Sequence, residues 1–275
     1  MAVIAMTREM GSLGKDVAAT VAERLGLTVV HHELVEEALS ARLGLQESKV
    51  HRYLEGHATL MERWKIDKAR MSHFTAEEVL ELAAKGNVII RGWGAVGLLR
   101  DVRHVLRVRI CAPLSDRTNR IKQRVHIPTD GQAIREVQTN DAGHAQTMRR
   151  FFNIDWQDPL LYDVVLNTAR LSVAACADIV ASLTQDPGYQ ETDASRAILQ
   201  DRLVAARVRS RLDEADKIGL ATSAVNLSVG SGTVELHGLA DDDAAITELQ
   251  RIVRETPGVV DVRSNLRHRA VPAAF

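Results

Sequence analysis

The stretch TREMGSLGKD, residues 7–16, decides the fold of the chain that carries it. It nearly matches the phosphate-binding pattern G-x-x-x-x-G-K-[S/T], in which backbone amides and a helix N-terminus converge on phosphate oxygens. Gly14 and Lys15 match the pattern, but Glu9 stands where the first glycine is expected. Asp16 stands where the pattern has a hydroxyl. The motif alone therefore favours a phosphate site and an ordinary strand–turn–helix about equally.

The surrounding sequence has the context that a phosphate site requires. Residues 2–7 (AVIAMT) are a continuous apolar run, typical of a strand buried on both faces. Residues 16–25 have the apolar rhythm of a helix that Gly26 ends, and residues 27–32 (LTVVHH) predict a second strand. Strand, glycine turn, helix and strand form a βαβ unit, which favours a parallel sheet.

The pattern continues to about residue 185 and predicts an α/β domain with a parallel sheet flanked by helices. Further strands are expected at residues 87–92, 105–113 and 162–168. Helices are expected at residues 33–43, 47–54, 60–69, 76–84 and 171–183, and a charged helical region capped by Ser115 runs to about Arg150.

The character of the chain changes after the polar stretch QDPGYQETDAS, which contains Pro187-Gly188 and predicts a linker at residues 186–194. A second domain is expected at residues 195–270, followed by a short tail, 271–275. It begins with a helix at 197–216, and strands at 224–229 and 233–238 alternate around a glycine-containing hairpin turn. A helix at 241–256 and a strand at 259–266 complete a small α-β-β-α-β fold.

Composition excludes several classes of protein. The chain has 275 residues, 45% hydrophobic and 26% charged, with a formal net charge of -1, so we expect a buried core and no nucleic-acid partner. Cys111 and Cys176 form no C-x-x-C pair, which argues against a disulfide framework or a zinc cage. No apolar run approaches ~20 residues, so we expect no transmembrane segment and, by default, a cytoplasmic protein.

Arginines occur where a phosphate ligand would need them. Arg91 ends the predicted strand 87–92, and ligands collect at the carboxyl ends of strands in open parallel sheets. The helix after the fourth strand has three arginines on one face, and two more follow: Arg117, Arg120, Arg124, Arg149 and Arg150. Guanidinium groups bind phosphate oxygens in pairs, although each of these arginines alone is more often a solvated surface charge.

Five segments in order resemble the nucleoside monophosphate kinases, and most closely the cytidylate-kinase-like family, over roughly residues 1–185. They are TREMGSLGKDVAATVAERLGL, HELVEEAL, VIIRGWGAVGLLRD, VLRVRICAPLSDRTNRIKQR and DWQDPLLYDVVLNT. The resemblance implies a P-loop kinase fold in which residues 33–85 form a helical insert that receives the monophosphate. It also implies that residues 115–155 form a mobile lid, which excludes water when it closes.

The resemblance implies an ATP- and Mg²⁺-dependent phosphotransferase and assigns roles by position. The donor phosphates would lie against Gly11, Ser12, Gly14, Lys15 and Asp16. Arg91 would contact the acceptor nucleotide. Phosphates would be clamped during catalysis by Lys15, Arg117, Arg120, Arg124, Arg149 and Arg150.

Three positions depart from the family pattern. His31 stands where the family tends to have an aspartate, Ile90 where typical members have an acidic residue near the metal, and Asp16 in place of the hydroxyl. A carboxylate at position 16 can bind Mg²⁺ but repels phosphate, and it also suits the first turn of a helix. The alternative is therefore a catalytically impaired nucleotide sensor that signals through the second domain.

Two further features have open interpretations. The aromatic residues between lid and fifth strand, Phe151, Phe152, Trp156 and Tyr162, would stack on a base or, more simply, pack the lid against the core. Residues 195–269 resemble a BON domain in element order and in SGTVELHGLADDDAAITELQRIVRETPGVVDVRSNL. That resemblance implies a non-catalytic module for a protein partner or an anionic lipid surface, which the basic C-terminal stretch RSNLRHRA would contact.

Overall fold

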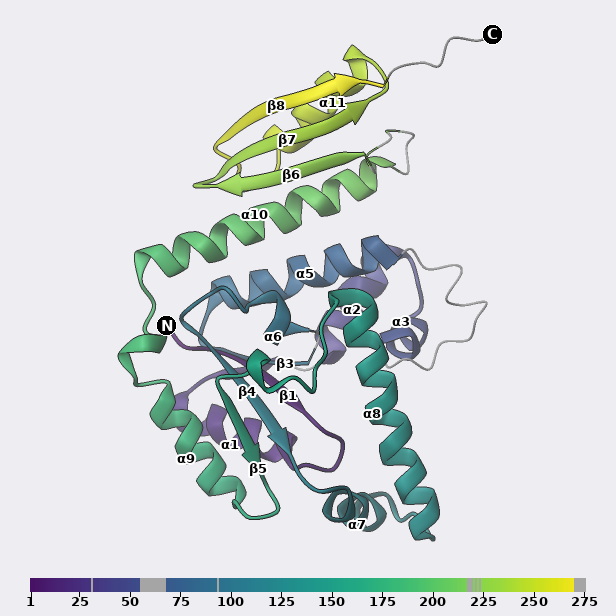
Figure 1. Cartoon of the computed structure of the whole chain (residues 1–275), viewed down its shortest axis with the longest axis vertical. Coiled ribbons are helices and arrows are strands. Elements are labelled where there is room, and N and C mark those ends of the chain that lie inside the picture. Colours follow the sequence, from purple (N-terminus) through teal and green to yellow (C-terminus); the bar gives the residue numbers. More distant parts are fainter. Residues whose placement is uncertain are drawn as a thin grey trace. The chain divides into compact units, whose positions relative to one another are not determined.

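The chain folds into two compact units, Met1–Ser195 and Arg196–Phe275 (Figure 1). The computed structural model describes residues 1–30, 32–54, 68–92, 94–216, 220, 222 and 224–269. Each unit has its own sheet and its own apolar core. The two-domain arrangement expected from the sequence is therefore confirmed.

The first unit is built on a parallel sheet whose strands lie in the order β2-β3-β1-β4-β5. The strands are β1 (Val3–Arg8), β2 (Thr28–Val30), β3 (Val88–Arg91), β4 (Val105–Cys111) and β5 (Val164–Asn167). The central strand β1 is buried from Val3 to Thr7, because both faces of the sheet are covered by helices. The predicted α/β class and parallel sheet are confirmed.

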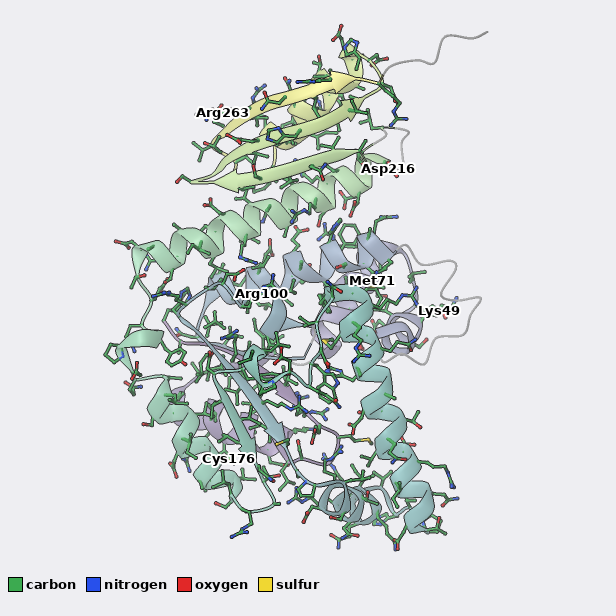
Figure 2. All side chains as sticks on the ribbon, in the orientation of Figure 1. Lys49, Met71, Arg100, Cys176, Asp216 and Arg263 are labelled. Atoms are coloured by element: carbon green, nitrogen blue, oxygen red, sulfur yellow. The ribbon has the colours of Figure 1, made fainter. Side chains whose placement is uncertain are left out.

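The helices of the first unit are α1 (Gly14–Leu25), α2 (His32–Leu43), α3 (Glu47–Leu54), α5 (Lys68–Lys85), α6 (Ala95–Leu98), α7 (Leu114–Val125), α8 (Asp130–Phe152) and α9 (Val173–Leu183). Helices α1 and α9 pack together on one face of the sheet, and Cys176 lies in that core (Figure 2). On the other side, α5 contacts β3 and α6 contacts β1. The described residues of the segments 33–85 and 115–155, expected to form the insert and the lid, are largely helical.

Two helix predictions need correction. The helix predicted at 76–84 begins at Lys68, because the buried side chains of Met71 and Phe74 anchor the additional turns. The helix predicted at 60–69 lies mostly outside the described residues. Ser115 is not the cap of α7, because Pro113 occupies that position with the extended backbone (φ -55°, ψ 147°) that a helix start requires. Ser115 is instead the second residue of the helix.

The end of the first unit is ordered beyond α9. A short 3₁₀ helix, Pro187–Tyr189, is capped by the Asp186 carboxylate, which accepts a hydrogen bond from the Gly188 amide at 2.7 Å. Tyr189 packs against the core between the sheet and α1/α9. Part of the segment predicted as a linker is therefore held on the first unit.

The second unit has the predicted α-β-β-α-β order. Its elements are α10 (Asp193–Asp216, which starts within the last residues of the first unit), β6 (Val225–Gly230), β7 (Thr233–Ala240), α11 (Asp243–Arg254) and β8 (Asp261–His268). Strand β7 is central, antiparallel to β6 and parallel to β8, and its inward side chains share a core with the two helices. Among the described residues of the chain, no helix combines the length and the apolar character needed to cross a membrane.

Candidate functional site

The candidate site begins at the turn between β1 and α1. Gly11 has a positive φ of 78°, and a Cβ there would lie 2.7 Å from the Arg117 carbonyl oxygen, so no other residue fits without movement. Leu13 also has a left-handed backbone, with a φ of 60°, which is a strained conformation for a branched residue. The turn is thus tight, and the surrounding structure fixes its shape.

Hydrogen bonds from side chains hold the carbonyl groups of this turn. Arg117 Nη1 donates to the Met10 carbonyl oxygen at 3.3 Å, and Arg120 Nη1 donates to that of Gly11 at 3.2 Å. The Thr168 hydroxyl, which follows β5, donates to the Ser12 carbonyl oxygen at 2.8 Å. Three hydrogen bonds, two from α7 and one from the segment after β5, therefore hold the turn in one orientation.

The amides at the start of α1, unlike these carbonyl groups, take part in no hydrogen bond with the described residues. Within the described part of the chain, no group accepts a hydrogen bond from the backbone amides of Gly14, Lys15 or Asp16. The first internal bond of the helix runs from the Val17 amide to the Leu13 carbonyl oxygen at 3.0 Å. Because these amides add to the positive end of the helix dipole, this helix start is suited to bind an anion.

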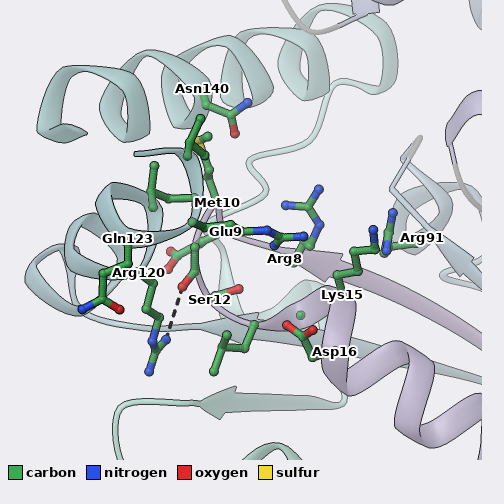
Figure 3. A pocket seen from close by; sticks show the side chains of 16 residues that line it. Arg8, Glu9, Met10, Ser12, Lys15, Asp16, Arg91, Arg120, Gln123 and Asn140 are labelled. Atoms are coloured by element: carbon green, nitrogen blue, oxygen red, sulfur yellow. Dashed lines mark hydrogen bonds between the residues drawn. The ribbon is translucent and has the colours of Figure 1, made fainter. Parts of the chain in front are cut away.

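A cleft of about 860 Å³ opens over this helix start (Figure 3), and its volume is typical of a nucleotide-sized ligand. It is bounded by the turn and first residues of α1, the end of β3, and parts of α7 and α8. Its lining residues are Arg8, Glu9, Met10, Gly11, Ser12, Leu13, Gly14, Lys15, Asp16, Arg91, Arg120, Ile121, Gln123, Arg124, Val125 and Asn140.

The cleft brings together most of the residues expected from the sequence. These are Gly11, Ser12, Gly14, Lys15, Asp16, Arg91, Arg120 and Arg124. The Lys15 side chain is exposed and forms no hydrogen bond or ion pair with the described residues. Arg120 is tied to the turn, as the dashed line in Figure 3 marks, and also donates to the Thr168 hydroxyl at 3.0 Å.

The Glu9 carboxylate is bound by neighbouring groups of the protein, so its charge does not repel a phosphate in the cleft. Its carboxylate accepts hydrogen bonds from Arg109 Nη2 at 2.8 Å and from the Ala112 amide at 3.2 Å, and it lies 3.4 Å from Arg117 Nε. The side chains of both arginines are less than 10% exposed. The residue that replaces the first glycine of the motif is thus neutralised within the protein.

Arg117 lies behind the turn and does not line the cleft. It is 7% exposed and donates to the Asp141 carboxylate on α8 at 2.8 Å and to the Ala112 carbonyl oxygen at 3.0 Å. Burial raises the pKa of Asp141, against the lowering effect of the Arg117 hydrogen bond and charge. Arg117 therefore joins the turn, the end of β4 and α8.

The remaining predicted residues lie elsewhere. Arg149 is 70% exposed, with Asp155 at 3.4 Å, and the guanidinium group of Arg150 lies over the Phe151 ring at 5.9 Å. Neither of these arginines lines the cleft. Ile90 is fully buried in β3, and His31 lies outside the described residues.

The aromatic residues after α8 pack in the protein interior. Trp156 and Tyr162 are 2% and 7% exposed, and the Tyr162 hydroxyl donates to the Trp156 carbonyl oxygen at 2.5 Å. Burial raises the pKa of Tyr162, so the phenol stays neutral. The Arg109 guanidinium lies 4.7 Å from the Trp156 ring, which connects this cluster to Glu9. In this arrangement the aromatic rings serve packing.

Two important residues were missed by the sequence analysis. Arg8 lines the cleft, and Arg109 binds Glu9. Arg109 interrupts an apolar strand and Arg8 ends one, and these positions were the available signal, because a charge on a buried strand requires a partner or a ligand. Alternation along β1 would also have placed Arg8 and Glu9 on opposite faces.

The metal site expected from the resemblance has one candidate ligand. No group of three or more His, Cys, Asp or Glu side chains within the described ranges could hold a metal ion. Asp16 borders the cleft with an exposed side chain. A single carboxylate is compatible with Mg²⁺, which is commonly held by one or two carboxylates together with substrate phosphates.

Comparison with known proteins agrees with this geometry. The model of the Cytidylate kinase-like family matches residues 3–170, and the BON domain model matches residues 200–270. A cytidylate kinase from Methanocaldococcus jannaschii is 26% identical over 168 residues, which are 60% of this chain and 88% of that protein. A cytidylate kinase from Pyrobaculum aerophilum is 28% identical over 177 residues, 63% of this chain and 87% of that protein.

A solved structure shows the same fold. The crystal structure of an uncharacterized protein from Eubacterium ventriosum superposes with a TM-score of 0.52 and 18% identity, and the match covers 68% of this chain and 99% of that one. Through its first unit the chain belongs to the cytidylate kinase-like family, and a BON domain follows that unit.

Proposed function

We propose that the first unit transfers the terminal phosphoryl group of ATP to a nucleoside monophosphate, with a cytidylate-type nucleotide as the acceptor. The observation that carries the proposal is the cleft over α1, which the Lys15 ammonium group and Arg91 share with the amides of Gly14–Asp16, for which the described residues offer no acceptor. Phosphoryl transfer needs positioning and charge neutralisation more than covalent chemistry by the protein. The cleft supplies both.

The roles of the residues follow from their positions. The amides of the turn and Lys15 bind the donor phosphates, and Arg91 binds the acceptor. Arg120 and Arg124 on α7 neutralise charge from the lid side. An acceptor phosphate oxygen then forms the new P–O bond while the bond between the γ-phosphorus and the leaving ADP breaks.

Arg117, Arg149 and Arg150 have weaker support as phosphate ligands. Arg117 is committed to Glu9 and Asp141, so we propose that it holds the turn in shape. Arg149 and Arg150 lie at the end of α8 and would reach a phosphate only after a movement of the lid.

We propose that Asp16 holds Mg²⁺ together with the phosphates of ATP. Bound Mg²⁺ would neutralise the charge of the donor phosphates. Asp16 lies one residue after Lys15 and borders the same cleft, so its carboxylate would face the metal side of the polyphosphate.

A coupled assay tests this proposal. The purified full-length chain is mixed with ATP, Mg²⁺ and each of CMP, dCMP, UMP and AMP, and ADP formation is followed. We expect turnover above background with CMP or dCMP. Turnover with AMP alone would refute the cytidylate preference, and no turnover with any acceptor would refute the kinase.

Asp16 also favours a second candidate, a nucleotide sensor that binds without catalysis. A carboxylate in the first turn repels phosphate, and the phosphate-binding pattern has a hydroxyl there. The sensor would bind ATP or a monophosphate in calorimetry yet form no ADP. Asp16→Ser would restore the motif, so a gain of turnover in that variant alone supports the sensor.

We propose that the BON domain attaches the enzyme to a protein partner or to an anionic lipid surface in the cytoplasm. Arg263 and Arg267 on β8 are exposed, and Figure 2 shows the Arg263 side chain extending from the strand. Co-sedimentation of the full-length chain with vesicles tests the lipid role. Binding to phosphatidylglycerol vesicles but not to phosphatidylcholine vesicles supports it, and no binding to either leaves only a protein partner.

A further inference from the structure

Strand register places Arg8 and Arg91 on the same face of the sheet. Met6 of β1 is paired in register with Arg91 of β3, and residues paired in register point to the same face. Arg8 lies two residues after Met6, so its side chain emerges on that face as well. The face is the one that α1 covers, because Met6 and Ile89 share a core with Val17 of α1. Both arginines therefore leave the sheet at the start of α1.

Packing against α1 fixes the direction of the Arg8 side chain. A Cβ at Gly14 would lie 2.6 Å from Arg8 Cβ and 3.2 Å from Arg8 Cδ. The aliphatic part of Arg8 thus runs along the first residue of the helix, where only a glycine leaves room for it. The guanidinium group then reaches the cleft, and Figure 3 shows Arg8, Lys15 and Arg91 turned into that cleft.

The charge around Arg8 is arranged for an anion. Lys15 adds a third positive group from α1, so β1, β3 and α1 each contribute one. The neighbouring Glu9 points to the opposite face, where Arg109 and Arg117 neutralise it. Asp16 is the acidic residue that remains at this side of the cleft.

We propose that Arg8 binds the phosphate of the acceptor together with Arg91, forming a subsite that selects a phosphomonoester over an unphosphorylated nucleoside. The inference rests on the proposed function, because it assigns the acceptor to this end of the cleft. Two guanidinium groups offer paired N–H donors to a phosphate dianion, and Lys15 lies beside them toward the donor.

Calorimetry with the full-length protein tests the subsite. Arg8→Met keeps the length of the side chain and removes its charge, and Arg135→Met on the exposed face of α8 is the matched control. We expect Arg8→Met to raise the Kd for CMP by about tenfold or more, since a hydrogen bond to a charged group is lost. The Kd values for cytidine and ATP should stay within about threefold, and Arg135→Met should change none of them.

Arg8→Lys provides a second variant, because it keeps the charge and loses the paired donors. We expect an intermediate Kd for CMP, and this variant decides the test if Arg8→Met fails to fold in a melting experiment. An unchanged Kd for CMP, or equal weakening of CMP and ATP, would overturn the subsite while leaving the kinase intact. A wild-type protein that binds no monophosphate would overturn the proposed function and the subsite with it.

Discussion

Glu9 and Arg109 form an ion pair of 2.8 Å that joins the turn after β1 to the neighbouring strand β4. Glu9 replaces a glycine of the phosphate-binding pattern, yet its carboxylate serves the architecture of the turn. The same carboxylate lies 3.4 Å from Arg117, whose guanidinium group also holds the Met10 carbonyl oxygen. Charged side chains therefore fix the turn on the side away from the cleft, and the amides of Gly14–Asp16 have no acceptor among the described residues.

The Glu9–Arg109 pair predicts a large loss of stability when one partner is removed. Glu9→Gln should lower the free energy of unfolding by about 3 kcal/mol, because two buried guanidinium groups lose a counter-ion. Urea denaturation measures the change. In a double-mutant cycle with Arg109→Met, the coupling energy should exceed about 1 kcal/mol. The exposed pair Arg24–Asp178 is the control, and Asp178→Asn should cost under about 1 kcal/mol. A coupling energy near zero for Glu9 and Arg109 would contradict this prediction.

The backbone of the turn predicts a specific effect of Gly11→Ala. The φ of 78° costs an alanine about 1–2 kcal/mol, and the Arg117 carbonyl oxygen at 2.7 Å from the new Cβ must also move. Gly26→Ala is the matched control, since Gly26 has a φ of 64° and open space around its Cβ position. Both variants should lose stability in thermal melts, but only Gly11→Ala should also weaken ATP binding. Equal ATP affinity in the two variants would show that the turn does not contact the ligand.

Lys15→Ala is expected to weaken ATP binding by about tenfold or more without changing the melting temperature, because Lys15 makes no ion pair with the described residues. Lys85→Ala is the control, an exposed lysine at the end of α5 that precedes β3. Calorimetry and a melting curve suffice. Strong destabilisation with unchanged ATP affinity would assign Lys15 a structural role.

Asp141 predicts a pH dependence of stability. Its pKa is raised in the folded state, mainly by burial, so the folded protein binds this proton more tightly than the unfolded chain does. The resulting stabilisation is present at low pH and is lost as the pH rises through the raised pKa. The stability of the wild type relative to Asp141→Asn should therefore increase as the pH falls from about 7 to about 4.

Urea unfolding across that pH range measures the Asp141 effect. Glu136→Gln is the control, because Glu136 is an exposed carboxylate on the same helix. The difference in free energy of unfolding between Glu136→Gln and the wild type should vary less with pH. If Asp141→Asn instead gained stability relative to the wild type as the pH falls, the ion pair with Arg117 would affect the pKa of Asp141 more than burial does.

The sequence was most informative where one local pattern determined the structure. The apolar run before Gly11 predicted the buried strand β1, and the alternation around Gly230–Gly232 predicted the β6–β7 hairpin. The spacing of Arg120 and Arg124 predicted that both would face one site, and both line the cleft. Periodicity along a single element carries such information, because it fixes which residues share a face.

The sequence was least informative where separate elements meet. Arg117 has the same spacing pattern as Arg120 and Arg124 but does not line the cleft, because Glu9 from the turn after β1 and Asp141 from α8 bind it. Asp141 is 24 residues from Arg117 and Glu9 is more distant still, so neither partner leaves a local pattern. The role of Arg8 depends likewise on the register between β1 and β3, which only the assembled sheet defines.

The contact between Gly14 and Arg8 has an evolutionary consequence. The glycine of the motif makes room for a neighbouring side chain, so the two positions constrain each other. Relatives that have a small residue in place of Arg8 should tolerate alanine in place of Gly14, and those that keep the arginine should not. The two positions are thus expected to change together during divergence, as a record of whether the proposed acceptor site has one arginine or two.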